Sequence, residues 1–148
     1  MYNVDILKNR EPLSLKLRMC FPRSTVLVFR VALLTALTAI MYLATTPADF
    51  PMTENLNDKL SHILAFYVLA LLLDFSFPEG RFDLSKAATL LGYGFLIESV
   101  QYLLPYRTFS LFDLSADAVG LLVYTFSLPA LKYIPWLRWR WRILELKK

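Results

Sequence analysis

Ionisable and amide side chains occur in three short motifs of this chain, at spacings that suit chemistry. Intervals of three or four residues within each motif place the side chains on one face of a helix. A carboxylate beside an imidazole can act as a general acid or base, and lysine and arginine can hold a phosphate or carboxylate. The candidate ligand-binding residues are Asp58, Lys59, His62, Glu98, Gln101, Arg107, Asp113 and Asp117.

A catalytic interpretation assigns Glu98 and Asp117 as an acid–base pair and His62 as a proton shuttle. No hydrolase or phosphatase signature accompanies them, and no serine lies in a nucleophile elbow. A metal site is not predicted either, because the chain has one histidine, no H-E-x-x-H motif and no paired cysteines. The sequence indicates no cofactor.

The motifs lie within or beside long apolar runs. With 57% hydrophobic and 19% charged residues, the composition is typical of a membrane protein. Apolar runs cover about 25–46, 61–77, 87–104 and 114–131, with Asp113 opening the last. Each is close to the roughly 17–25 residues that cross a bilayer as a helix. We therefore predict an all-α, integral membrane four-helix transmembrane bundle.

The predicted domains are a basic N-terminal segment (1–23), a four-span membrane domain (24–131) and a basic, aromatic tail (132–148). Lysine and arginine number five in the first segment, two between the second and third runs, and six in the tail. The other two connecting loops hold one each. The positive-inside rule then places both termini in the cytoplasm of a multi-pass protein, and we expect the bacterial inner membrane.

The tail, WLRWRWRILELKK, interleaves tryptophan with arginine. It could be a basic, aromatic site for nucleic acid or a partner protein. An interfacial amphipathic segment is the better interpretation, since tryptophan and arginine favour headgroup depth. With a net charge of +4 concentrated beside apolar runs, the expected partners are membrane lipids and not nucleic acid.

In this topology the eight candidate residues converge in the outer third of the bundle. Asp74 and Arg30 lie near the opposite face, as isolated polar residues would. Gly94 and Gly120 are expected to let the third and fourth spans approach closely at the level of the pocket.

The same motifs resemble those of the VanZ-like family of small bacterial membrane proteins. They read Asp58-Lys59-x-x-His62-x-x-x-Phe66, then Gly94-x-x-x-Glu98-x-x-Gln101-x-x-x-Pro105-x-Arg107, then Asp113-x-x-x-Asp117-x-x-Gly120. The resemblance covers residues 58 to 120 and implies a multi-pass membrane protein linked to envelope physiology or teicoplanin resistance. Tyr124 stands where members of the family often have a further glycine.

Three functions remain open at this point. We rank an outward-facing pocket for an anionic lipid headgroup or cell-wall precursor first, with Arg107 as bidentate partner and Lys59 as point charge. Acid–base catalysis on a lipid-linked phosphate is second. Purely structural pairing between helices is third, because interhelical polar contacts contribute only about 0.6 kcal/mol each. The oligomeric state stays open.

Overall fold

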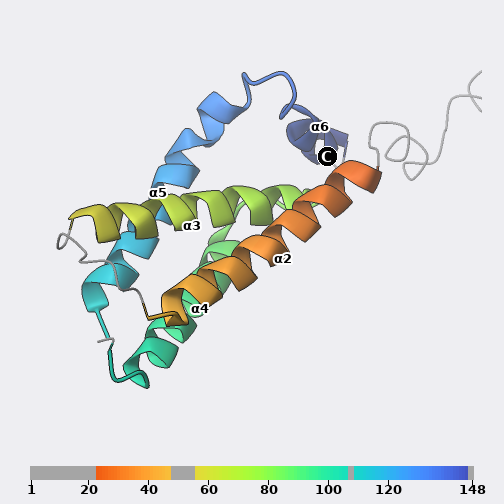
Figure 1. The fold of residues 1–148 in the computed structure, drawn as a ribbon. Coiled ribbons are helices and arrows are strands. Elements are labelled where there is room, and N and C mark those ends of the chain that lie inside the picture. Colours follow the sequence, from red (N-terminus) through yellow and green to blue (C-terminus); the bar gives the residue numbers. More distant parts are fainter. Residues whose placement is uncertain (1–22, 48–55, 107–108, 147–148) are drawn as a thin grey trace, which may run out of the picture.

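The computed structural model describes residues 23–47, 56–106 and 109–146, and all five regular elements within them are helices (Figure 1). The all-α class is therefore confirmed. Residues 1–22 of the predicted N-terminal segment lie outside the described residues. The helices are α2 (Arg23–Thr45), α3 (Leu56–Ser76), α4 (Leu84–Tyr102), α5 (Leu111–Leu131) and α6 (Trp139–Leu146).

Three of these helices, α2, α3 and α5, are long and apolar enough to cross a membrane. The fourth predicted span corresponds to α4, which is not among the three. It carries Lys86, Glu98 and Gln101 together with two glycines, and these lower its apolarity. Only 6% of the apolar window of α2 is buried, against 33% in α3 and in α5. A helix that is apolar on every side yet barely buried suits contact with lipid.

Consecutive long helices run in opposite directions, so the ends of the helices gather in two groups. At one end the last turns of α2 and α4 lie beside the first turns of α3 and α5. We call this the pocket end, because the cavity described below opens there. Gln101 of α4 donates to the Ala44 carbonyl of α2 there (3.1 Å). The opposite end contains the buried side chain of Asp74, and we call it the Asp74 end. There Arg30 of α2 donates to the Ser76 carbonyl of α3 (3.1 Å).

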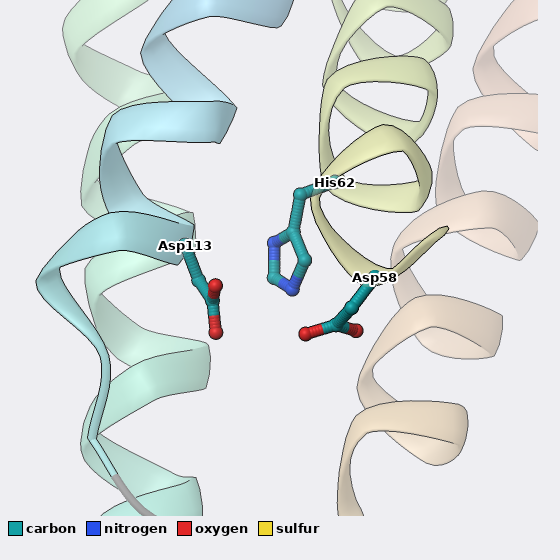
Figure 2. Close-up of side chains that lie close together, drawn as sticks. All are labelled: Asp58, His62 and Asp113. Carbon is teal, nitrogen blue, oxygen red and sulfur yellow. The ribbon is translucent and has the colours of Figure 1, made fainter. Parts of the chain in front are cut away.

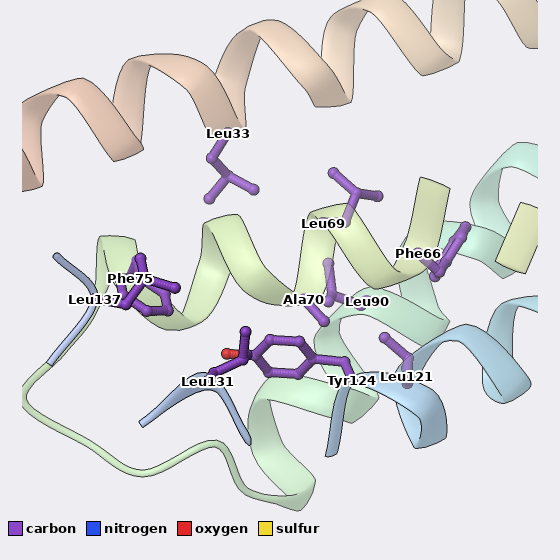
Figure 3. Close-up of a cluster of buried hydrophobic side chains, with 10 residues drawn as sticks. All are labelled: Leu33, Phe66, Leu69, Ala70, Phe75, Leu90, Leu121, Tyr124, Leu131 and Leu137. Atoms are coloured by element: carbon purple, nitrogen blue, oxygen red, sulfur yellow. The ribbon is translucent and has the colours of Figure 1, made fainter. Parts of the chain in front are cut away.

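The apolar core is built around α3, which packs most extensively against α5 and α2. Side chains from all four long helices and the segment before α6 meet in it (Figure 3). Its buried members are Leu33, Phe66, Leu69, Ala70, Phe75, Leu90, Leu121, Tyr124, Leu131 and Leu137. This core fixes the relative position of the helices that carry the polar motifs.

Side-chain caps fix where two helices begin. Asp83 caps α4 by accepting from the Lys86 backbone N–H (3.2 Å), and Ser110 caps α5 by accepting from that of Asp113 (3.3 Å). The prediction that Asp113 opens the last span is thus wrong by three residues. Asp113 lies in the first turn, where its negative charge favours the helix N-terminus.

Asp74 is fully buried and binds side chains from three other elements. Lys86 of α4 donates to Oδ1 and Tyr124 of α5 donates to Oδ2, both at 2.8 Å. Arg140 of α6 also donates to Oδ1, and it is only 2% exposed. The prediction that Asp74 is an isolated polar residue is therefore wrong, because its partners come from distant parts of the chain.

The tail, predicted as an interfacial segment, packs against the other helices through α6. Trp139 packs against Phe29 and Phe75, with ring centroids 5.9 and 5.2 Å away. Ile143 is buried, whereas Trp136 is exposed. Together with Arg140, these contacts dock α6 onto the Asp74 end of the bundle, where it shields the buried carboxylate from water.

Replacing Arg140 with alanine should destabilise the protein, because it removes one cation from a buried ion pair. Such a loss costs about 3 kcal/mol at the low end of the usual range, since Lys86 and Tyr124 still bind Asp74. The measurement is thermal unfolding of the purified protein in detergent. Arg142→Ala is the matched control: Arg142 is exposed on the same helix and its removal should leave the midpoint unchanged. Equal effects of the two variants would contradict this role of Arg140.

Candidate functional site

A cavity of about 530 Å³ opens at the pocket end of the bundle, between α2, α3, α4 and α5. Five of the eight predicted site residues line it: Asp58, Lys59, His62, Gln101 and Asp113. Apolar side chains of α2 also line it, namely Ile40, Leu43 and Ala44, and so do apolar residues of α3 and α4. The predicted convergence of three polar motifs thus produces one cavity whose wall is partly polar and partly apolar.

Two further predicted residues, Glu98 and Asp117, do not line the cavity and are each 1% exposed. Asp117 accepts through Oδ1 from Nδ1 of His62 (2.8 Å). Glu98 accepts through Oε2 from the Ser110 backbone N–H (2.9 Å). The predicted pairing of Glu98 with Asp117 is therefore replaced by two separate contacts. Arg107, the eighth residue, lies outside the described residues.

His62 lies between the buried carboxylate of Asp117 and the cavity. Its side chain is 20% exposed, whereas that of Asp117 is 1% exposed. Because Asp117 occupies Nδ1, Nε2 is the ring nitrogen left to face the cavity. In Figure 2 this nitrogen points between the carboxylates of Asp58 and Asp113. A buried carboxylate that orients an imidazole in this way also fixes which nitrogen carries the proton.

Asp58, His62 and Asp113 each offer one potential metal-ligand atom, and these atoms lie within 4.8 Å of one another. All three side chains are half-buried. The grouping has no sequence motif because it joins one turn of α3 to the first turn of α5. This explains why motif spacing alone indicated no metal site.

Lys59 and Gln101 take different places in the cavity wall. Gln101 is 8% exposed and its amide is committed to the Ala44 carbonyl. Lys59 is half-buried, and its ammonium lies 5.8 Å from the centre of the Phe112 ring. Lys59 is therefore the one lysine or arginine among the described residues that line the cavity, whereas Gln101 mainly holds α2 against α4.

Several residues that shape the site were not predicted from the sequence. Ser110 joins Glu98 to the start of α5, and Tyr106 lines the cavity while donating to the Thr45 carbonyl (2.7 Å). Ser110 carried a signal, since serine is a favoured N-cap and lies three residues before Asp113. Nothing in the local pattern identified Tyr106 or the apolar wall from α2.

Two glycines permit the close packing behind the cavity. A β-carbon at Gly94 of α4 would overlap a carboxylate oxygen of Asp117 on α5. Gly94 therefore lets these two helices approach closely, as predicted. A β-carbon at Gly120 of α5 would lie 2.5 Å from the Ile63 carbonyl oxygen. Gly120 therefore brings α5 against α3, not against α4 as predicted. Both contacts support the approach of Asp117 to His62.

Comparison of the chain with protein-family models, with curated proteins and with solved structures finds no match. The resemblance to the VanZ-like family stays a prediction from the three motifs.

Substituting Gly120 with alanine should lower the stability of the protein by about 1–3 kcal/mol, because the new methyl group would overlap backbone of α3 that cannot rotate away. Gly92→Ala is the control, since a β-carbon there meets nothing within 4 Å. That substitution should be neutral or stabilise α4 by up to about 1 kcal/mol. Thermal unfolding in detergent measures both. A Gly120→Ala protein as stable as Gly92→Ala would contradict the α3–α5 contact.

Proposed function

We propose that this is a membrane protein of VanZ-like type whose cavity binds the anionic headgroup of a membrane amphiphile. The observation that carries the proposal is the mixed lining of the cavity. Apolar side chains of α2 form one wall, and Lys59, His62 and Asp113 contribute polar groups on the other side. An amphiphile presents the same two chemistries side by side.

The position of the cavity supports entry from the bilayer. Much of its apolar lining belongs to α2, the candidate span with the least buried surface and the one best suited to contact lipid. A hydrocarbon chain lying along α2 would bring its headgroup to the polar wall. Lys59 supplies the described positive charge, and Arg107 is the second cation that the sequence predicts near this end.

We further propose that the pocket end faces the outside of a bacterial inner membrane. The positive-inside rule supports this orientation, because lysine and arginine are concentrated before α2, between α3 and α4, and after α5. The motif resemblance supports a role in envelope physiology or glycopeptide tolerance. In this setting the ligand would be an envelope lipid or a lipid-linked cell-wall precursor that carries a phosphate.

One contact favours a second candidate function, acid–base catalysis on a lipid-linked phosphate. His62 reaches the cavity and is oriented from behind by the buried carboxylate of Asp117. A base positioned by a third group is the arrangement that general-base and nucleophilic catalysis use. Glu98 supports this candidate less well, because it is buried behind the cavity and is bound to the start of α5.

The orientation can be tested with single cysteines in a Cys20→Ser background. Phe109→Cys lies beside the pocket end and should react with a membrane-impermeant thiol reagent added to intact cells. Gly80→Cys lies in the loop between α3 and α4, and it should react only after the membrane is permeabilised. Residues 80 and 109 are both exposed, so access to each depends on the side of the membrane and not on burial. The opposite labelling pattern would contradict the proposed orientation.

Binding can be tested by retention of a radiolabelled polyprenyl phosphate on the purified full-length protein. Lys59→Ala should weaken binding about tenfold, since a hydrogen bond to a charged group contributes about 1.5–3 kcal/mol. Lys132→Ala removes an exposed lysine at the Asp74 end and should leave retention unchanged. Equal retention by both variants would contradict the headgroup site. Release of inorganic phosphate that is lost in Asp117→Asn would instead support the catalytic candidate.

A further inference from the structure

We propose that Asp58, His62 and Asp113 bind a single divalent cation of the zinc type at the mouth of the cavity. Metal binding itself goes beyond the proposed function, whereas the role given below to the cation rests on that function. The three residues come from facing turns of α3 and α5, and their carboxylates and imidazole surround one point in Figure 2. No sequence motif joins them.

The distances fit a site that closes on its ion. The ligand atoms of the three side chains lie within 4.8 Å of one another. Around a tetrahedral zinc ion, with bonds of about 2.0–2.2 Å, ligand atoms are about 3.3 Å apart. Side-chain rotation of Asp58 and Asp113 can supply this approach of about 1.5 Å, because the described residues offer neither carboxylate a hydrogen bond or ion pair that would hold it.

His62 is already prepared for the ion by a buried partner. Asp117 binds Nδ1 and leaves Nε2 directed at the two carboxylates. Metal-binding histidines typically donate their second ring N–H to a carboxylate, which fixes the tautomer and strengthens the ligand. Asp117 is 1% exposed and cannot serve as a cavity ligand itself, so its role is that of a positioning residue.

The charges around the cavity explain how a bound cation would help an anionic headgroup to bind. Asp58 and Asp113 line the cavity, and Glu98 and Asp117 lie behind it, whereas the described lining holds one ammonium, that of Lys59. An anionic headgroup would be repelled by this surplus of carboxylates. Glu98 adds to the surplus with a buried oxygen, Oε1, that no described residue satisfies. A divalent cation on Asp58 and Asp113 offsets their negative charge and makes the electrostatic potential favourable for the headgroup.

The ligand set also indicates the kind of ion. One imidazole and two carboxylates, without a thiolate, suit zinc or manganese better than magnesium, which prefers oxygen ligands and water. Three protein ligands leave at least one coordination position open. In the proposed function, a phosphate oxygen of the headgroup occupies that position beside Lys59.

The test uses the full-length protein with its affinity tag removed, in a Cys20→Ser background and after chelator treatment, in nanodiscs of uncharged lipid. Titration calorimetry with zinc chloride alone should give one bound ion per chain. Asp58→Asn and Asp113→Asn should each weaken binding at least tenfold, and Asp117→Asn should weaken it about 10–100-fold. Lys132→Ala removes an exposed lysine that does not line this cavity and should bind zinc normally. Absence of binding, or binding that survives both ligand substitutions, would overturn the proposal.

A second readout separates ligation from misfolding. His62→Cys places a thiolate at the site, so cobalt binding should produce the intense charge-transfer absorption of a cobalt–thiolate bond. Ser115→Cys is the matched control, because residue 115 is exposed on α5 and offers no site. A charge-transfer band in His62→Cys alone supports the proposal. Its absence in His62→Cys, or an equal band in the control, would count against it.

The lipid assay distinguishes the two proposals. Retention of polyprenyl phosphate that falls with chelator and returns with zinc supports both of them. Retention that is indifferent to zinc would overturn the role of the cation and leave the proposed function in place. Zinc binding by a protein that retains no lipid in either condition would overturn the proposed function and leave the metal site in place.

Discussion

The structure depends on the need of each buried carboxylate for a donor on another element. Asp74, Glu98 and Asp117 are at most 1% exposed and lie in helices that are otherwise apolar. A carboxylate removed from water without a partner costs several kcal/mol, so each one must recruit a donor. Asp117 recruits His62 across α3 and α5, and Glu98 recruits the Ser110 backbone at the start of α5. Because the donors lie on other elements, the same contacts that satisfy the charges also set which helices meet.

Carboxylates at the Asp74 end and at the pocket end are paired differently, and the difference favours the pocket end as the functional one. At one end, Asp74 binds Lys86, Arg140 and Tyr124, and α6 covers it. Such a site is closed and its carboxylate is bound through both oxygens, as expected of a structural ion pair. At the other end, carboxylates outnumber the described cations, and two of them, Asp58 and Asp113, line a cavity. An excess of one charge beside open space is poorly explained by helix packing alone, and it calls for a ligand.

Sequence patterns identified the elements and much of the site for a definite physical reason. Hydropathy over long windows reveals helices that suit a bilayer, and intervals of three or four residues reveal which side chains share a face. Both properties belong to a single helix. For that reason the convergence of Asp58, His62 and Asp113 at one end could be expected once alternating helix directions were assumed. The same reasoning identified Gln101 as a residue of the cavity, although it could not show that the Gln101 amide binds a carbonyl of α2.

Pairings between helices were not predictable in the same way, because they depend on the rotation and crossing angle of each helix. The catalytic interpretation took Glu98 and Asp117 as an acid–base pair, yet Glu98 accepts from a backbone N–H in the loop before α5. One partner of Asp74, Arg140, lies 66 residues along the chain, in a tail whose own pattern indicated only an interfacial segment. In both cases the donor became available only through tertiary structure. No local pattern of charge or hydropathy carries that information.

The position of α2 shows how the cavity keeps an apolar wall next to its polar groups. Side chains of α4 and the following turn reach α2 mainly through backbone oxygens. Tyr93 donates to the Leu37 carbonyl, Gln101 to that of Ala44, and Tyr106 to that of Thr45. The last two carbonyls belong to the final turn of α2, where they have no partner within the helix. Since these contacts use the backbone, the side chains of α2 stay available to face lipid on one side and the cavity on the other. Ile40, Leu43 and Ala44 of α2 therefore line the cavity beside its polar groups, and the proposed site for a membrane amphiphile rests on this arrangement.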